Sequence, residues 1–363
     1  MKRLHEAIRA IREPDAAAAR AARARQAALT KPAGSLGTLA GLHVQLAAIQ
    51  RTPLPAIDRP AVLVVAADHG VADAGVSAYP KQVTGEMARN FATGGAAINV
   101  LAADAGARLL VADLGIDWQG RTPPPEIVPL AVAPGTANLA DGPAMTRSQA
   151  IQSIECGLDL AARLVSEGAD AIALGEMGIG NTTASAAIIA ALTGRPPRDV
   201  TGIGTGIDAE RWERKVAIVE RALARAKLSP DDPLGVLTEV GGFEIGALAG
   251  ATIGGAAAGL PIVLDGSIVG AAALLAVTFA PAVRPFLIAS HRSVEPGHRI
   301  VLELLELQPL MDLGLRLGEG SGAAMALHLI RLACKLPREM ATFDEAGVSR
   351  KSAPARLSAP RRT

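Results

Sequence analysis

The chain has 363 residues, which is enough for one large domain or two of modest size. Half of the residues are apolar, 38 are glycine and only 2% are aromatic, a mixture typical of α/β proteins with tight helix–sheet packing. The 36 basic and 35 acidic side chains leave a formal net charge of +1, so composition argues against nucleic acid as a partner.

The first 50 residues have a helical pattern that the segment KPAGSLG at 31–37 interrupts. They are rich in alanine and charge and contain no continuous apolar core of the signal-peptide type. The two cysteines, Cys156 and Cys334, stand in no metal-binding or redox spacing. These features predict a cytoplasmic protein whose thiols are reduced and buried.

Five short apolar runs lie between Ala-rich helical stretches, and each has the pattern of a buried parallel strand. The alternation predicts an α/β fold, with a parallel sheet and helices on both faces. Polar residues follow the runs as DHG, DLG, GEMGIGN, LDG and SHRS, and ligands bind outside the carboxyl ends of strands in such sheets. The runs are residues 61–67, 107–117, 169–183, 259–266 and 284–293.

Two glycine-rich loops that precede helices are candidate phosphate sites, GEMGIGNTT at 175–183 and GIGTGID at 202–208. Glycine lets backbone amides approach a phosphate at a helix N-terminus. Neither loop is a Walker loop or a dinucleotide fingerprint, and simple turns capped by Asn181 or Thr182 and by Asp208 fit equally well. Lys215, in the following helix, either adds charge to this site or faces solvent.

Two uncharged stretches, 245–264 and 266–283, resemble membrane segments, but alanine and glycine dominate them. Asp265 separates the two, and a bilayer span needs about 20 strongly apolar residues. We therefore expect buried helix and strand there and no membrane contact. Residues 296–346 return to a helical pattern, and the basic segment 350–363 predicts a disordered tail.

Asp68, His69, His291 and His298 could converge as metal ligands. Their spacing matches no zinc pattern, and these histidines with a single carboxylate make a thin ligand set. Hydrogen-bonded structural or substrate-orienting roles are favoured, so no metal and no cofactor are expected.

The segment LGEGSG at 317–322 places one carboxylate, Glu319, among three glycines that allow a ligand to approach closely. Partial burial would raise its pKa, which suits a general base. The alternative is a glutamate in the first turn of a helix, where the helix dipole favours negative charge.

Nine short segments carry a family resemblance: TKPAGSLG at 30–37, AADHGVADAGVSAYP at 66–80, ATGGAAINVLA at 92–102, ALGEMGIGNTTASAA at 173–187, GTGID at 204–208, GGFEIGALAGA at 241–251, IASHRSVEPGH at 288–298, PLMDLGLRLGEGSGAA at 309–324 and MATFDEAGVS at 340–349. Together they resemble the nicotinate-nucleotide–dimethylbenzimidazole phosphoribosyltransferases of cobalamin synthesis. Each segment is short, but the set, in the family's order, is highly specific.

The resemblance implies a doubly wound, Rossmann-like parallel sheet in a large domain over 59–295. It also implies a smaller helical domain from both chain ends, 1–58 and 296–349, and a homodimer without metal. The implied reaction moves the 5-phosphoribosyl group of nicotinate mononucleotide onto 5,6-dimethylbenzimidazole. Ser267, after LDG, and the pair Gly85-Glu86 depart from the family pattern.

The family's catalytic base corresponds to Glu319, and its benzimidazole-lining serine to Ser77. The predicted substrate-binding residues are Ser77, Tyr79, Glu176, Gly178, Asn181, Gly202, Gly204, Gly206, Lys215, Asp265, Ser290 and Ser293. A non-catalytic binding protein for benzimidazole or its riboside and a membrane component are the competing interpretations. The joint presence of Glu319, Glu176 and Lys215 favours the enzyme.

Overall fold

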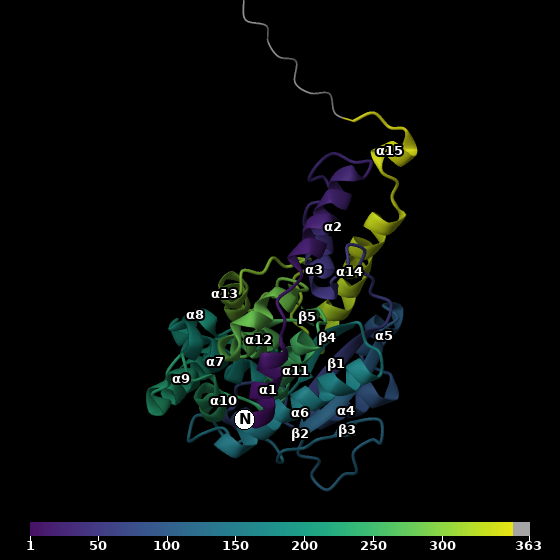
Figure 1. Cartoon of the computed structure of the whole chain (residues 1–363). Coiled ribbons are helices and arrows are strands. Elements are labelled where there is room, and N and C mark those ends of the chain that lie inside the picture. The colour runs from purple at the N-terminus through teal and green to yellow at the C-terminus, as the bar shows by residue number, and fades with distance from the viewer. Residues whose placement is uncertain (351–363) are drawn as a thin grey trace, which may run out of the picture.

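Six parallel strands form the central sheet of the computed structural model, which describes residues 1–350 (Figure 1). Their order is β3-β2-β1-β4-β5-β6, so the sheet grows in opposite directions from the β1–β4 pair and is doubly wound. The fold class predicted from the sequence is confirmed. The strands are β1 Pro60–Ala67, β2 Arg108–Gly115, β3 Val128–Pro129, β4 Ala171–Met177, β5 Ile262–Leu264 and β6 Leu287–Ala289.

All eight residues of β1 are buried, as expected for a strand covered on both faces. Its side chains alternate between two apolar clusters. Leu63 and Val65 pack with the helices α1 Lys2–Ala10, α6 Arg147–Ser166, α7 Asn181–Thr193, α8 Pro197–Val200, α9 Ala209–Ala226, α10 Pro233–Val240, α11 Phe243–Ala257, α12 Ser267–Phe279 and α13 Pro296–Leu304. Val62 and Val64 pack with α3 Thr38–Gln50, α4 Val83–Thr93, α5 Ala97–Asp104 and α14 Ser321–Glu339.

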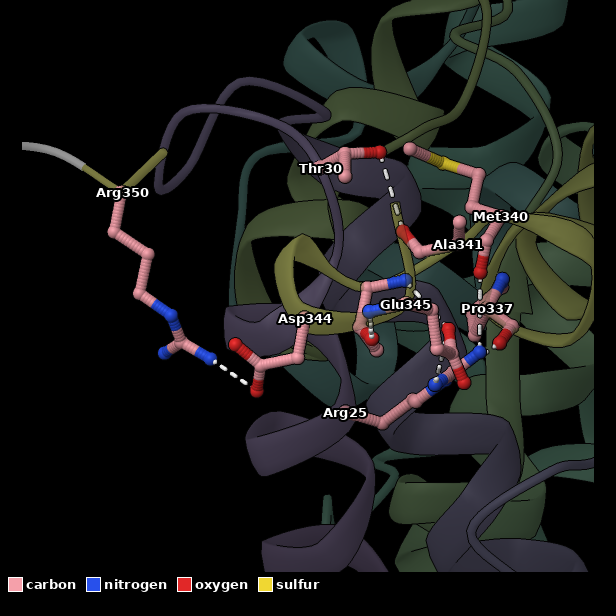
Figure 2. A network of polar contacts seen from close by, with 9 residues as sticks. Arg25, Thr30, Pro337, Met340, Ala341, Asp344, Glu345 and Arg350 are labelled. Carbon is pink, nitrogen blue, oxygen red and sulfur yellow. Dashed lines mark hydrogen bonds and ion pairs between the residues drawn. The ribbon is translucent and has the colours of Figure 1, made fainter. Parts of the chain in front are cut away.

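Helices from the two ends of the chain lie together, as the purple and yellow segments of Figure 1 show: α2 Ala16–Ala28 and α3 from the N-terminal part, α14 and α15 Phe343–Ala346 from the C-terminal part. Arg25 of α2 donates to the carbonyls of Pro337 and Met340, at 2.9 and 3.1 Å (Figure 2). The backbone of Thr30 donates to the Ala341 carbonyl at 3.1 Å. By contrast, α1 packs on α6 and α11, and the predicted domain boundaries stay a prediction.

The segment 305–320 is a loop, although the sequence predicted helix over 296–346. Pro309 and glycines at 314, 318 and 320 prevent helix there, and these three glycines have positive φ. The loop instead pairs in parallel with the residues that follow β6. The Met311 amide donates to the Ser290 carbonyl, and the Arg292 amide donates to the Met311 carbonyl. It thereby crosses the carboxyl end of the sheet.

The two uncharged stretches form α11, β5, α12 and the start of a 3₁₀ turn at Pro281–Phe286; another 3₁₀ turn lies at Gly70–Ala74. None of the helices within residues 1–350 has the length and apolar character needed to cross a bilayer. Both cysteines are free; Cys334 is buried, whereas Cys156 is only half-buried. The predicted disordered tail falls, apart from Arg350, outside the described residues.

Candidate functional site

A cavity of about 510 Å³ lies at the carboxyl ends of β4, β5 and β6. This is the edge where the polar clusters were predicted to gather, beside the point at which the strand order reverses. Its walls come from α4, the loop after β4, the glycine loop at 202–206, the start of α12 and the long loop before α14. The lining residues are Tyr79, Val83, Met87, Glu176, Met177, Gly178, Ile179, Asn181, Thr182, Gly204, Thr205, Gly266, Ser267, Ile268, His291, Ser293, Glu295, Arg316, Leu317, Gly318 and Glu319.

A larger depression of about 760 Å³ lies between α3 and the edge strand β6. Its two charged lining residues, Arg284 and Glu306, form an ion pair at 3.2 Å, which leaves no unpaired charge on that surface among the described residues. The smaller cavity gathers several buried titratable groups and is therefore the candidate active site.

Seven predicted site residues line this cavity: Tyr79, Glu176, Gly178, Asn181, Gly204, Ser293 and Glu319. Within the described part of the chain, the other six do not line it: Ser77, Gly202, Gly206, Lys215, Asp265 and Ser290. Ser77 instead shares a hydrogen bond with Thr205 at 3.1 Å, and Ser290 shares one with Nδ1 of His291 at 2.9 Å. These bonds link them to residues that do line the cavity.

Glu319 occupies a tight turn that ends just before α14. It has a φ of 63°, flanked by Gly318 at 87° and Gly320 at 81°, and the Ser321 amide donates to the Gly318 carbonyl at 3.0 Å. Positive φ at both central residues is the geometry of a type I′ turn, which glutamate adopts at a cost of about 1–3 kcal/mol. The alternative of a glutamate within the first helical turn is wrong, because α14 begins at Ser321.

Glu319 is only 6% exposed, and its Oε2 has no hydrogen-bond partner within residues 1–350. Burial raises its pKa, and the amide of Ile98, at the N-terminus of α5, opposes that rise. A buried carboxylate that has an unsatisfied oxygen and belongs to a residue of a cavity wall is a candidate acceptor for a proton from a bound molecule.

Glu176, at the end of β4, is a second buried acid in the wall. Burial raises its pKa to about 8, and the nearby carboxyls of Asp265, Glu244 and Glu319 add to the rise, while a hydrogen bond from Asn181 opposes it. Glu176 is therefore protonated at neutral pH. A Cβ at residue 318 would collide with Glu176 Oε1, so only glycine fits between the two glutamates.

Amides of both glycine loops already donate within the protein. The Ile179 amide donates to Thr84 Oγ1 at 3.0 Å and the Asn181 amide donates to the Gly178 carbonyl at 3.1 Å. In the second loop, the Gly204 amide donates to Glu295 Oε1 at 2.9 Å. These amides are not free to cradle a phosphate. Asp208 caps α9, as the turn interpretation predicted, whereas the predicted cap by Asn181 or Thr182 is wrong, because α7 begins after Gly180 without a side-chain cap.

Lys215 is fully buried, so the alternative of a solvent-facing lysine is wrong. Its Nζ donates to Thr182 Oγ1 at 2.8 Å and to the Gly202 carbonyl at 3.2 Å, which ties the start of α7 to the second glycine loop. Burial lowers the pKa of this ammonium to about 8, and the Glu295 carboxylate acts in the opposite direction.

The four residues considered as metal ligands divide into separate hydrogen-bonded groups. His69 Nε2 lies 2.7 Å from Glu244 Oε1, and Asp68 accepts from the Asp117 amide at 2.8 Å. His298 Nδ1 accepts from the Ser293 amide at 3.0 Å, and burial lowers the pKa of His298 to about 3, so the ring is neutral. Within residues 1–350 no group of three or more potential ligands is arranged to hold a metal ion.

Sequence reasoning missed Arg316 and Glu295. Arg316 is the only arginine among the described residues that line the cavity, and its Nη1 donates to the Gly204 carbonyl at 3.3 Å. Arg316 stands three residues before Glu319 in a segment already quoted for the resemblance, so its position was the available signal. Apolar walls come from Met87 and Ile268, which nothing in the local sequence singled out.

Comparisons with known proteins find relatives over nearly the whole chain. A family model described as phosphoribosyltransferase matches residues 11–348. The chain is 54% identical over 352 residues to the nicotinate-nucleotide–dimethylbenzimidazole phosphoribosyltransferase of Roseiflexus sp. (strain RS-1), with 97% of this chain and 99% of that protein covered. The protein of the same name from Chloroflexus aurantiacus (strain ATCC 29366 / DSM 635 / J-10-fl) is 53% identical over 337 residues, covering 93% and 96%.

Two crystal structures from Thermus thermophilus share the fold. One, of a nicotinate-nucleotide–dimethylbenzimidazole phosphoribosyltransferase, has a TM-score of 0.88 at 50% identity and covers 93% of this chain and 100% of that one. The other, of CobT, has a TM-score of 0.89 at 51% identity, with 92% and 100% covered.

Proposed function

The chain belongs to the nicotinate-nucleotide–dimethylbenzimidazole phosphoribosyltransferase family, and we propose how the residues of the strand-end cavity carry out that family's reaction. The enzyme transfers the 5-phosphoribosyl group of nicotinate mononucleotide to 5,6-dimethylbenzimidazole. The products are α-ribazole 5′-phosphate and nicotinate, and the step belongs to cobalamin biosynthesis.

One ring nitrogen of dimethylbenzimidazole attacks C1′ of the ribose while the bond from C1′ to the pyridinium nitrogen breaks. The bonding electron pair moves to the departing ring and neutralises its positive charge, so nicotinate leaves without further activation. Attack from the face opposite the leaving group converts the β-nucleotide into an α-riboside. The second ring nitrogen of the benzimidazole must then lose its proton.

Glu319 is the proposed acceptor of that proton. The observation that carries this assignment is its buried carboxylate, whose unpartnered Oε2 belongs to a residue of the cavity wall. General-base assistance contributes about 10²–10⁴-fold to a rate. A proton on Glu176 removes charge repulsion between the two carboxyl groups, and this favours the ionised form of Glu319, the form that can accept a proton.

Arg316 is the proposed partner of the 5′-phosphate. The glycine-loop amides at 179, 181 and 204 are engaged, and Lys215 is buried behind Thr182. A guanidinium offers several donors to phosphate oxygens, and it already borders the loop at Gly204. Because three of the loop amides are engaged, we assign the main phosphate contact to the Arg316 side chain, next to the second glycine loop.

Substitution Glu319→Gln tests the base assignment. Turnover should fall about 10²-fold or more, while the KM for nicotinate mononucleotide and the unfolding midpoint stay close to those of the unchanged enzyme. Glu319→Asp serves as the matched variant, since it keeps a carboxylate but retracts it by one methylene, and it should retain more turnover than the glutamine variant. Near-normal nicotinate release by Glu319→Gln would remove Glu319 from this role.

Three further expectations stay predictions: the homodimer, the cytoplasmic location and the absence of a metal requirement. Assignment of Ser77 and Tyr79 to the benzimidazole pocket is also a proposal. It is supported by Tyr79 in the cavity wall and by the bond from Ser77 to Thr205, a lining residue.

A further inference from the structure

The N-terminus of α14, directly after Glu319, has no cap of its own. Its N-cap residue is Gly320, which has no side chain. The first amides of a helix lack intrahelical acceptors and need partners from elsewhere. The acceptors for three of these amides are the carboxylate oxygens of Asp265, which lies at the end of β5, 55 residues before Gly320.

Asp265 accepts three of these amides. Its Oδ1 accepts from the amides of Gly322 at 2.8 Å and Ala323 at 3.2 Å, and its Oδ2 accepts from the amide of Gly320 at 3.3 Å. The remaining early amide, that of Ser321, closes the turn around Glu319 by donating to the Gly318 carbonyl. Every amide from 320 to 323 thus has a partner, and Asp265 holds the three that no local group can reach.

The hydrogen bonds to Asp265 hold the strained turn around Glu319 on the side away from the cavity. Asp265 is 1% exposed and lies outside the cavity wall, so its carboxyl group contacts the start of α14 and would not contact a molecule in the cavity. On the other side, a Cβ at residue 322 would collide with the imidazole of His291, so the start of α14 is also packed against a lining side chain. A non-glycine residue keeps a positive φ only where contacts with the surrounding structure hold its backbone in that conformation.

We propose that Asp265 is a positioning residue for the reaction: it caps α14 across the sheet edge and so holds the turn that carries Glu319 at the reacting nitrogen. The inference rests on the proposed base role of Glu319, and it reassigns Asp265 from the substrate-binding role expected from the sequence. Burial raises the pKa of Asp265 to about 7, and the amides of Ala323, Gly322 and Gly320 oppose that rise, as donors at a helix N-terminus do. Displacement of a catalytic group by about 1 Å costs on the order of 10²-fold in rate.

Steady-state kinetics of Asp265→Asn and Asp265→Ala test the proposal. In Asp265→Asn the amide oxygen still accepts from Gly322 and Ala323, whereas its NH₂ faces the Gly320 amide, donor against donor. We expect kcat to fall about tenfold in this variant and about 10²-fold in Asp265→Ala, with the KM for nicotinate mononucleotide within about twofold. If the alanine variant does not fold, the isosteric asparagine variant carries the test alone.

Asp113 offers the matched control. It is also a buried carboxylate at the end of a strand, and it accepts the amides of Gly115 and Ile116 at 2.8 Å each. Asp113→Asn should lower the unfolding midpoint without changing kcat. An equal fall of kcat in the Asp113 and Asp265 variants would reduce Asp265 to a general structural role and overturn the proposal.

A double-mutant cycle separates this proposal from the one on which it rests. If Asp265 acts through Glu319, then Asp265→Asn should lower kcat in the unchanged enzyme but have no further effect in the Glu319→Gln background. Full turnover of Glu319→Gln alone would defeat the base assignment. Loss of turnover in Glu319→Gln with normal kcat in Asp265→Asn, or additive losses in the double variant, would defeat only the inference about Asp265.

Discussion

A methyl group added at Gly175 would test whether the backbone position of Glu319 sets the rate. Gly175 is in β4 and faces the turn before α14. A Cβ there would lie 2.5 Å from the carbonyl carbon of Glu319, where ordinary contact begins near 3.4 Å, so the Glu319–Gly320 peptide must retreat by about 0.9 Å. Since a misplacement of about 1 Å costs on the order of 10²-fold, kcat of Gly175→Ala should fall by roughly that factor. Overpacking should also destabilise the fold by about 1–3 kcal/mol.

The assay is nicotinate release by Gly175→Ala beside a variant overpacked elsewhere. Gly254→Ala suits this purpose, because its Cβ would meet Ala161 Cβ at 2.9 Å where α11 packs on α6, across the sheet from the turn. This control should lose stability in urea without losing kcat. Full kcat in a folded Gly175→Ala enzyme, or equal losses in both variants, would refute the view that sub-ångström placement of Glu319 limits the reaction.

Two other predictions follow from the cavity wall. Arg316→Ala should raise the KM for nicotinate mononucleotide about tenfold or more, because a charge-assisted hydrogen bond contributes roughly 1.5–3 kcal/mol. Arg292→Ala is the control and should leave this KM unchanged, since the Arg292 guanidinium pairs with Asp312 at 3.4 Å. An unchanged KM in Arg316→Ala would contradict the phosphate assignment. Glu176 has a pKa of about 8 in the fold against an ordinary value of 4.5, so the folded chain keeps a proton that the unfolded chain loses in that interval. Glu176 should therefore make the free energy of unfolding fall by at most about 1.4 kcal/mol per pH unit as pH rises from about 4.5 to 8, and Asp265, whose pKa burial raises to about 7, should add to the fall. Urea titrations of Glu176→Gln should show a shallower fall than the unchanged enzyme, and an identical slope would refute this interpretation.

The sheet could be predicted from the sequence because its signal is local. The run at 61–67 is apolar throughout and rich in valine, which is what a strand covered on both faces requires, and it forms β1. The two-residue strand β3 was missed, since Val128–Pro129 is too short to produce a pattern. The loop at 305–320 was assigned to helix although Pro309 and the glycines at 314, 318 and 320 argue against a helix locally. Only its pairing with Ser290 and Arg292 depends on residues distant in the sequence.

The site shows the same division between local and distant information. The glycines around residue 319 marked Glu319 as a candidate site residue, because a turn with positive φ is determined by the residues that form it. The partners that occupy the glycine-loop amides, Thr84 and Glu295, come from distant segments, so no loop motif could reveal that a phosphate would find those amides engaged. Burial of Lys215 is likewise a tertiary property.

Four acidic residues, Glu176, Glu244, Asp265 and Glu319, lie close together at the cavity. They can do so because of the way in which each carboxyl group is hydrogen-bonded or protonated. Asp265 accepts amides of α14, and Glu244 pairs with His69 at 2.7 Å. Glu176 is held neutral by burial and by the carboxyls around it. Only Glu319 keeps a buried oxygen without a partner while it lines the cavity, within the chain described here. Since the neighbouring acids are paired or protonated, the proposal that Glu319 accepts the proton assigns that role to the carboxylate whose turn is held by Asp265.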